Sequence, residues 1–212
     1  MVTHATGLMD NGMAVAISAS TRMSNEGYVE GTYYSGASYF VSLEKKLNEK
    51  HSIGLVAFGA PTIQGRRSIS VQETYDLTGN NYYNSFWGYQ NGEKRNSRIR
   101  NNHLPVVMLN HYFTLNEKTK INTSGFYSFG RSGNTRLNWY DASDPRPDYY
   151  RNLPSYYGQP GDEAINNQLT QLWSSNDPST TQIDWDQLYF ANSKNLFTCL
   201  LYTSDAADEG HC

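Results

Sequence analysis

The chain has 212 residues, with 17 Lys and Arg against 20 Asp and Glu, a hydrophobic fraction of 38% and 17 tyrosines. This nearly balanced charge argues against a nucleic-acid-binding tail. Two cysteines are too few for a disulfide-dense scaffold or a four-thiolate zinc site. No segment approaches the roughly 18 consecutive apolar residues of a membrane-spanning helix. The abundance of Tyr, Gly and Asn is typical of strands joined by turns and ring-bearing loops.

The two ends of the sequence differ from the rest. Met1 is not followed by a basic segment and an apolar segment, so no signal peptide is predicted, and either the protein is cytoplasmic or its start lies upstream. Residues 199–212 contain both cysteines, and the run from Cys199 to Glu209 resembles the translated sequence of a transposase-type DNA-sequencing adapter. We therefore treat residues 199–212 as a non-native tail and residues 1–198 as the protein domain.

Alternation of apolar and polar residues predicts a series of strands. From Met13 onward, Val15 and Ile17 share one face while small and polar residues occupy the other, which is typical of a half-buried strand. The preceding Asp10-Asn11-Gly12 predicts a hairpin with a type I′ turn. The same criteria predict strands near residues 2–7, 13–22, 38–47, 52–60, 104–115, 120–131 and 184–197.

The connections between these strands alternate in length. Those at 8–12, 48–51 and 116–119 are short, whereas 23–37, 61–103 and 132–182 are long. Tight turns at one end of an antiparallel meander and long loops at the other are the layout of an outer-membrane barrel. We therefore expect an all-β fold: an open, up-and-down piece of a transmembrane β-barrel with long external loops. A short helix at 164–175 is also expected, because Ile165, Leu169 and Leu172 recur at helical spacing.

Two long loops are rich in aromatic residues. Tyr and Trp offer large, rigid contact surfaces with a polar group, so these loops are candidates to hold a ligand by stacking and hydrogen bonding. The alternative is that the rings pack on one another as a folded cap. The candidate ligand-binding residues are Tyr82, Tyr83, Trp87, Tyr89, Trp139, Tyr140, Tyr149 and Tyr150.

The order and spacing of several motifs look like the first barrel strands of TonB-dependent outer-membrane receptors, and most like their Bacteroidetes branch. The motifs of the strand region are Gly7–Gly12, Ile17–Arg22, Gly27–Thr32, Tyr39–Leu43, His51–Ile53 and Phe58–Pro61. Asp144–Tyr156 and Ile183–Tyr189 are similar to external-loop motifs of the same branch. The resemblance covers most of residues 1–198.

This resemblance implies energised uptake of a large nutrient, such as a siderophore, cobalamin or a glycan, across the outer membrane of a Gram-negative bacterium. It implies as partners the TonB complex, a plug domain, outer-membrane lipid and the extracellular ligand. The nearly neutral charge disfavours nucleic-acid binding, and neither a cofactor nor enzymatic activity is expected. Such transporters have about 22 strands, whereas about six or seven are expected here. The chain alone is therefore expected to be inactive, because unpaired strand edges are costly in hydrocarbon.

Two alternatives remain open at this stage. A soluble, aromatic-rich β-module that binds carbohydrate would have to cover the apolar strand face with a second sheet. A glycoside hydrolase would need two carboxylates within about 5–10 Å in a cleft, for which Asp184 and Asp186 beside Trp185 are candidates. The histidines show no metal-ligand spacing, so no metal site is predicted. Catalytic residues are expected only under the hydrolase alternative. The barrel hypothesis instead expects Val15, Ile17, Leu43, Leu55 and Tyr127 to be bare.

Overall fold

The computed structural model describes residues 1–139 and 142–194, and these form two compact units. Unit 1 comprises Met1–Met23, Ser35–Ile63 and Asn101–Gly133. Unit 2 comprises Ser24–Tyr34, Gln64–Arg100 and the described residues from Asn134 onward, 134–139 and 142–194. The predicted adapter-like tail at 199–212 lies outside the described residues.

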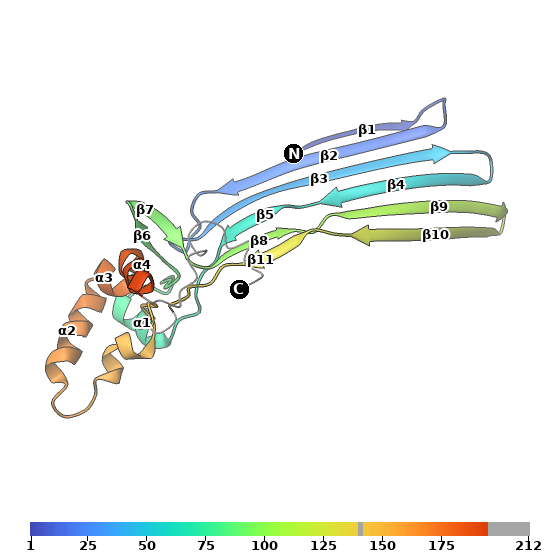
Figure 1. Cartoon of the computed structure of the whole chain (residues 1–212). Coiled ribbons are helices and arrows are strands. Elements are labelled where there is room, and N and C mark those ends of the chain that lie inside the picture. The colour runs from blue at the N-terminus through green and yellow to red at the C-terminus, as the bar shows by residue number, and fades with distance from the viewer. Residues whose placement is uncertain (140–141, 195–212) are drawn as a thin grey trace. The chain divides into compact units, whose positions relative to one another are not determined.

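Unit 1 is built on an antiparallel sheet whose long strands follow one another in sequence (Figure 1). The sheet strands are β1 (Val2–Leu8), β2 (Met13–Ser24), β3 (Tyr33–Lys46), β4 (His51–Gly59), β5 (Thr62–Gly65), β8 (Ile99–His103), β9 (Val106–Asn116), β10 (Thr119–Ser128) and β11 (Arg131–Asn134). β2 lies between β1 and β3, and β4 and β9 lie between β3 and β10. Within the described residues β1 and β10 each pair on one side only, so the sheet does not close into a barrel.

Three neighbouring strands of the sheet are interrupted where proline or glycine falls. Pro61 separates β4 from β5, Pro105 separates β8 from β9, and Gly130 separates β10 from β11. Proline cannot donate to a strand ladder, but the carbonyl of Pro105 still accepts from the backbone N–H of Phe129 at 3.2 Å. The interruptions explain why the sequence shows fewer, longer strands than the structure has.

The pairing register assigns each side chain of unit 1 to one of two faces. Leu43, Leu55 and Leu109 are opposite one another on β3, β4 and β9 and therefore share a face. The Ser20 hydroxyl lies 2.7 Å from that of Ser38, which places Ile17 of β2 on the same face as the leucines because side chains alternate. We call this the apolar face: Val15, Ile17, Val41, Leu43, Ile53, Leu55, Val107, Leu109, Ile121 and Tyr127.

The opposite face of the sheet is more polar, and we call it the mixed face. It carries serine and asparagine side chains, such as Ser42, Asn110 and Ser124, beside Phe40 and Phe58. The Ser124 hydroxyl donates to Oδ1 of Asn110 at 2.7 Å, so one buried amide of this face is satisfied across the β9–β10 pair.

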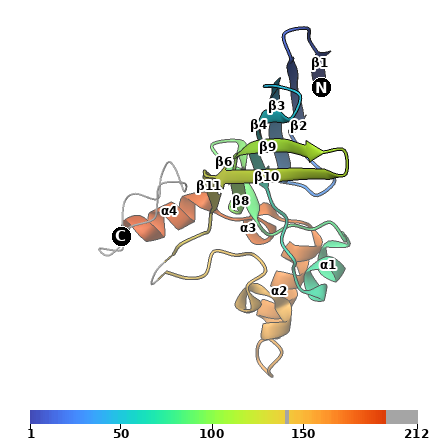
Figure 2. The same cartoon turned by 90° about the vertical axis from the view of Figure 1, so that its right-hand side faces the viewer.

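Unit 2 contains the helices and a small hairpin. Its elements are α1 (Gln72–Thr78), β6 (Trp87–Gln90), β7 (Glu93–Asn96), η1 (Tyr150–Asn152), η2 (Pro154–Tyr156), α2 (Glu163–Ser174), α3 (Pro178–Thr181) and α4 (Trp185–Lys194). Figure 2 shows α1 and α2 side by side. Among the described residues, the structure has no helix that is both long and apolar enough to cross a membrane.

The hydrophobic core of the described chain lies in unit 2. Its buried apolar side chains are Val29, Trp87, Leu153, Trp173, Ile183, Trp185 and Leu188. Ile183, Trp185 and Leu188 form one cluster, against which Trp139 packs. Unit 1 contributes no buried large apolar side chain to this set, so the two units differ in how their strands and helices are stabilised.

Each of the six strands predicted up to residue 131 has a counterpart in the same order, with shifted ends, but the structure has additional short strands, β5, β6, β7 and β8, that were not predicted. β3 begins at Tyr33, well before the expected residue 38, and the expected strand over 120–131 is divided into β10 and β11. The helix expected at 164–175 is confirmed as α2. The long connections are also more structured than expected, because 61–103 holds α1 and a hairpin as well as two sheet strands.

The strand expected over 184–197 is wrong, because α4 occupies Trp185–Lys194; residues 195–197 lie outside the described residues. Asp184 precedes the helix, and its Oδ1 accepts the backbone N–H of Gln187 at 2.8 Å. Apolar and acidic residues alternate over 183–186, and this short two-residue period resembles that of a strand. From Trp185 onward the buried positions follow helical spacing to Leu188, and Asp-x-x-Gln is a capping-box signal that the period-2 pattern obscured.

The hairpin at Asp10-Asn11-Gly12 forms, but not with the expected type I′ turn. That turn needs positive φ at both central residues, and only Gly12, at φ 74°, has it. Asn11 instead accepts the Met13 backbone N–H through Oδ1 at 2.9 Å. The two-residue turn with both φ angles positive is Asn91-Gly92, which joins β6 to β7.

Candidate functional site

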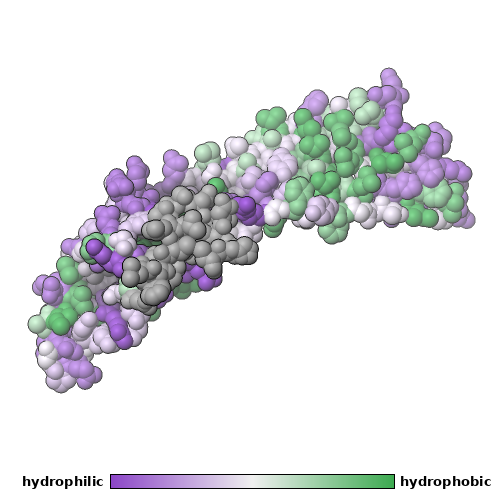
Figure 3. All heavy atoms as spheres, viewed as in Figure 1, coloured by the Kyte–Doolittle hydropathy of each residue, from purple (hydrophilic) through white to green (hydrophobic). Residues whose placement is uncertain are grey.

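The apolar face of unit 1 is the first candidate functional surface. Leu43, Leu55, Leu109 and Tyr127 expose 36%, 40%, 56% and 69% of their surface, and Ile17 exposes 46%. No second sheet covers these side chains within the described residues. Figure 3 shows hydrophobic residues gathered over the middle of the strands, with hydrophilic residues toward the β3–β4 and β9–β10 turns.

The expectation of a bare apolar face is confirmed for four of its five residues. Ile17, Leu43, Leu55 and Tyr127 are exposed, whereas Val15 is half-buried. Monomeric soluble proteins rarely leave apolar patches of more than a few hundred Å² open to water. The face can therefore meet an apolar solvent or partner at low desolvation cost.

Two histidines on this same face are closer than the sequence suggests. His51 on β4 and His111 on β9 lie on a diagonal across the β4–β9 pair, with Nδ1 of His51 2.9 Å from Nε2 of His111. The rings are parallel within 2°, and Phe113 stacks on His51 at 4.4 Å. The two histidines are 60 residues apart in the sequence, so the sequence pattern gave no sign that they would be neighbours. Within the described residues no group of three or more His, Cys, Asp or Glu side chains could hold a metal ion.

The second candidate region is a group of neighbouring tyrosines in unit 2, which we call the tyrosine cluster: Tyr149, Tyr150, Tyr156 and Tyr157. Successive rings meet edge to face, with centroids 4.6 Å, 5.4 Å and 5.2 Å apart along the series. Tyr150 and Tyr156 expose 51% and 47% of their surface. Such a row of rings offers both flat apolar area and hydroxyl groups to a ligand.

Buried polar contacts fix the backbone that carries the tyrosine cluster. Just before Tyr149, Asp148 accepts the hydroxyls of Ser70 at 2.9 Å and Ser85 at 2.8 Å. Just after Tyr150, the carbonyl of Asn152 accepts the indole N–H of Trp173 at 3.2 Å. The exposed rings are thus anchored on both sides by the surrounding elements, which limits their reorganisation on binding.

The phenol oxygen of Tyr150 accepts a hydrogen bond from Nε of Arg151 at 3.0 Å. The neighbouring hydroxyl of Tyr149, followed by Arg151, lowers the pKa of Tyr150 below its ordinary value of 10.0. The neighbouring hydroxyl of Tyr150 in turn raises the pKa of Tyr149. The Arg151 guanidinium also lies 5.6 Å from the Tyr150 ring centre.

Arg146 joins two further candidate rings. Its guanidinium lies 5.6 Å from the Trp139 ring centre and 5.9 Å from that of Tyr149. The same guanidinium forms an ion pair with Asp144, in which Nε of Arg146 donates to Oδ1 of Asp144 at 2.9 Å. This hydrogen bond raises the pKa of Arg146. Trp139, Arg146 and Tyr149 therefore form one continuous surface, held by a carboxylate.

The remaining candidate rings are used differently. Trp87 is 4% exposed and meets Tyr89 edge to face at 5.5 Å, so only Tyr89, 49% exposed, presents a free ring. Tyr83 packs on Trp173, and its hydroxyl donates to the carbonyl of Thr181 at 2.8 Å. Burial, followed by the charge of Asp148, raises the pKa of Tyr83. Both Trp87 and Tyr83 are therefore core residues.

Tyr82 is 58% exposed and has no ring contact with the other candidates among the described residues. Tyr140 lies outside the described residues. The structure thus brings together Trp139, Tyr149 and Tyr150 and leaves Tyr82 apart. The candidates chosen from sequence omitted Tyr156, Tyr157 and Arg151, although their adjacency to Tyr149-Tyr150 in a proline-punctuated segment was a usable signal.

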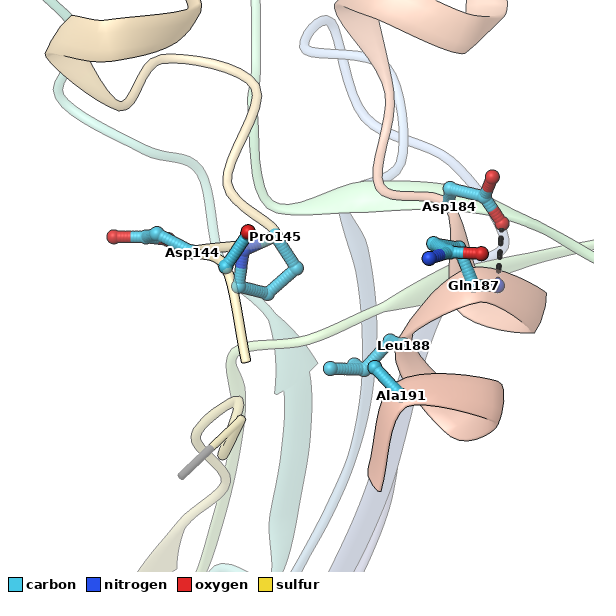
Figure 4. A pocket seen from close by; sticks show the side chains of 7 residues that line it. Asp144, Pro145, Asp184, Gln187, Leu188 and Ala191 are labelled. Atoms are coloured by element: carbon cyan, nitrogen blue, oxygen red, sulfur yellow. Dashed lines mark hydrogen bonds between the residues drawn. The ribbon is translucent and has the colours of Figure 1, made fainter. Parts of the chain in front are cut away.

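A cavity of about 290 Å³ lies beside α4 in unit 2. Its lining includes Asp144, Pro145, Asp184, Gln187, Leu188 and Ala191 (Figure 4). The carboxylate of Asp144 points away from Leu188 in this view and is engaged by Arg146. Asp184 caps α4. The two carboxylates nearest the cavity thus both have structural partners, which does not favour the hydrolase alternative.

The basic residues of β7 are also engaged within unit 2. Lys94 bridges Glu26 at 2.7 Å and Glu30 at 2.9 Å, and its ammonium lies 5.2 Å from the Trp87 ring centre. Arg95 stacks on Trp185, with 4.3 Å between the guanidinium carbon and the ring centre. These contacts use positive charge to hold β7 against its neighbours.

Comparison of the chain with family models, curated proteins and solved structures found no match. The resemblance to receptor barrels therefore rests on the sequence motifs alone.

Proposed function

We propose that the chain is a part of the barrel of a TonB-dependent outer-membrane receptor, which takes up a large nutrient such as a siderophore, cobalamin or a glycan. The single observation that supports this most is the exposed apolar face of unit 1, with leucines aligned across three strands. In the complete receptor this face meets lipid, and the mixed face looks inward to the plug domain. The TonB complex supplies the energy for transport.

Strand length and connectivity support the same proposal. β2, β3, β4, β9 and β10 contain 12, 14, 9, 11 and 10 residues, and a transmembrane strand needs about 9–11. The β1–β2, β3–β4 and β9–β10 connections are short, whereas unit 2 is formed from the long ones. Short turns on one side and long loops on the other distinguish outer-membrane barrels.

The chain alone is an inactive part in this proposal. β1 and β10 each have an edge without a partner within the described residues. In hydrocarbon every unsatisfied backbone group costs several kcal/mol. The missing strands and plug of the complete receptor supply those partners, and the natural location is the outer membrane of a Gram-negative bacterium.

The proposal is tested first by the gene from which the chain comes. We expect a plug-encoding segment upstream and further strands with two-residue periodicity downstream of residue 198. An intact reading frame that starts at Met1 and stops directly after residue 198 would overturn the assignment.

A second test examines the apolar face directly in detergent micelles. In a chain with Cys199→Ser and Cys212→Ser, single cysteines at Leu43 or Leu55 and at Ser42 or Val56 carry the same fluorophore. A detergent-borne quencher should quench the labels at 43 and 55 more strongly than those at 42 and 56, because the two sets lie on opposite faces. Equal quenching would argue for a soluble fold.

A soluble carbohydrate-binding module remains the second candidate, because Tyr150 and Tyr156 expose rings that could stack on sugars. It predicts a chain that stays monomeric in buffer without detergent and binds oligosaccharides. Sedimentation in buffer separates the two functions, since the barrel part should associate through its apolar face.

A further inference from the structure

We propose that three neighbouring arginines of unit 2 form a binding site for a phosphate monoester, a tetrahedral group that is close to a dianion at neutral pH. We call these residues the arginine row: Arg66, Arg98 and Arg136. The inference goes beyond the proposed uptake function and does not rest on it, because the arginine row and the residues that support it all belong to unit 2.

Backbone hydrogen bonds place the three arginines side by side. Arg66 directly follows β5 and Arg98 directly precedes β8, and these two strands pair with each other. The backbone N–H of Arg66 donates to the carbonyl of Arg98 at 2.9 Å. On the other side of β8, the N–H of Thr135 donates to the carbonyl of Ile99 at 2.9 Å, which brings Arg136 level with Arg98. Residues opposed in this way have β-carbons about 5 Å apart, so their long side chains can reach one ligand.

The charge of the arginine row is not neutralised by the protein. In the part of the chain that the structure describes, none of the three guanidinium groups forms a hydrogen bond or an ion pair. Arg146 differs, because Asp144 pairs with it and the charge of Asp148 also acts on it. Burial, followed by the charges of Arg146 and of the other two arginines in the row, lowers the pKa of Arg98. An anion bound between these like charges relieves their repulsion.

Arg98, the central residue of the row, is held in place before a ligand arrives. Its guanidinium lies 5.5 Å from the centre of the Phe86 ring, and it is half-buried, whereas Arg66 and Arg136 are exposed. Oδ1 of the buried Asn96 accepts the Arg98 backbone N–H at 2.7 Å, and Nδ2 of the same side chain donates to the Arg66 carbonyl at 2.8 Å. These contacts reduce the ordering that binding requires, and the exposed ends of the row give a ligand access from solvent.

The chemistry of these groups selects the class of anion. A guanidinium is a planar fork of N–H donors that matches pairs of oxygens on carboxylates and phosphates. A carboxylate is satisfied by one such fork and carries a single charge. Adjacent guanidinium groups instead match a group with several outer oxygens and a larger charge, and a phosphate monoester loses its second proton at a pKa of about 6. Binding is non-covalent and transfers no electron.

The test is calorimetric titration of the full chain in mild detergent, in buffer of physiological ionic strength at about pH 8, above the second phosphate pKa. Two probes separate the sources of a phosphate monoester: glycerol phosphate is soluble, and dioctanoyl phosphatidic acid is a lipid. We expect saturable binding of at least one probe. Arg98→Gln should weaken this binding by about tenfold or more, the usual effect of losing a hydrogen bond between charged groups. Tighter binding of glycerol phosphate would indicate a soluble ligand, and tighter binding of phosphatidic acid a lipid headgroup.

Matched variants distinguish a built site from general attraction by positive charge. Arg67→Gln removes the same charge from the exposed residue that follows Arg66 but lies outside the row. In this buffer it should change the affinity by less than about threefold, because salt screens exposed charges. Near-ultraviolet circular dichroism checks that Arg98→Gln keeps the fold of unit 2. The absence of saturable binding with both probes, an unchanged affinity in Arg98→Gln, or an equal loss in Arg67→Gln overturns the proposal. None of these results depends on the labelling of residues 42, 43, 55 and 56, so the two proposals fail or stand separately.

Discussion

The indole of Trp87 lies directly over the α-carbon of Gly31, so closely that a β-carbon on Gly31 would overlap the indole ring. Gly31 also has a φ of 73°, in the left-handed region that favours glycine. One glycine thus satisfies a backbone requirement and a packing requirement at once, and it allows Trp87 to be 4% exposed in unit 2.

Gly31→Ala should destabilise unit 2 by about 3 kcal/mol or more, because left-handed strain and overpacking add. Gly79→Ala is the matched control. Gly79 has a φ of 61° with open space around the position of a β-carbon, so only the backbone term of about 1 kcal/mol applies. Urea unfolding monitored by tryptophan fluorescence compares the two. Equal losses would mean that the contact with Trp87 is not tight.

The apolar face should control association of the chain in water. Leu43→Arg with Leu55→Arg removes two leucines that are opposite each other on β3 and β4. Each contributes on the order of 1 kcal/mol to association when its exposed part is buried. The control, Ser42→Arg with Val56→Arg, adds the same charge on the mixed face. We expect sedimentation in buffer to show markedly smaller assemblies for the leucine variant than for the control, and similar assemblies would contradict a specific role of the apolar face.

The Glu26–Lys94 ion pair should make unit 2 less stable in acid. The hydrogen bond from Lys94, followed by one from the Gly31 backbone, lowers the pKa of Glu26 below its ordinary 4.5. A lowered folded-state pKa stabilises the fold fully above the unfolded value, and the contribution is lost as the pH falls through the folded value. Glu26→Gln should therefore cost about 0.5–1 kcal/mol near neutral pH, because the side chains are partly exposed and screened.

This difference between wild type and Glu26→Gln should vanish at pH values below the lowered pKa. The free energy of unfolding, measured by urea titration across the acid range, provides the check. Glu93→Gln on β7 serves as the control. A difference that persists unchanged in strong acid would show that the carboxylate charge is not involved.

Asp184 should be a structural residue of α4. Because its side chain accepts the Gln187 N–H at 2.8 Å, Asp184→Ala should destabilise unit 2 by about 1 kcal/mol. Asp186→Ala, an exposed change within the first turn, should cost only about 0.3–1 kcal/mol through the helix dipole. Thermal unfolding compares the two variants. Glycan hydrolysis by the wild type that is lost in either variant would instead revive the hydrolase alternative.

Local pattern was enough to predict most of unit 1. The two-residue alternation that includes Val15 and Ile17 identified β2 and its faces, and the polar tetrapeptides after Leu47 and Leu115 identified two tight turns. A strand's side chains alternate whatever lies around it, so its faces can be assigned from the sequence. The helical spacing of Ile165, Leu169 and Leu172 identified α2 for the same kind of reason.

The local sequence pattern gave wrong predictions where the same few residues are compatible with more than one local structure. Ile183-Asp184-Trp185-Asp186 alternates like a strand, but the cap from Asp184 and the burial of Trp185 and Leu188 produce α4. The exact turn at Asp10-Asn11-Gly12 was also wrong, because the side chain of Asn11 provides a hydrogen bond that competes with the expected backbone geometry. In both places a hydrogen bond to one polar side chain, Asp184 or Asn11, contributes to the backbone geometry that the pattern did not predict.

At the candidate site, the sequence determines less and the tertiary structure decides more than in the strands of unit 1. By itself, the sequence determined that rings gather in the long connections and that the strands have one apolar face. Only the tertiary structure decided that Trp87 and Tyr83 are core residues, whereas Tyr150 is exposed and accepts a hydrogen bond from Arg151. The physical reason is that residue type sets what a side chain can do, but burial and hydrogen-bond partners come from segments far away in the chain, such as Trp173 for Tyr83.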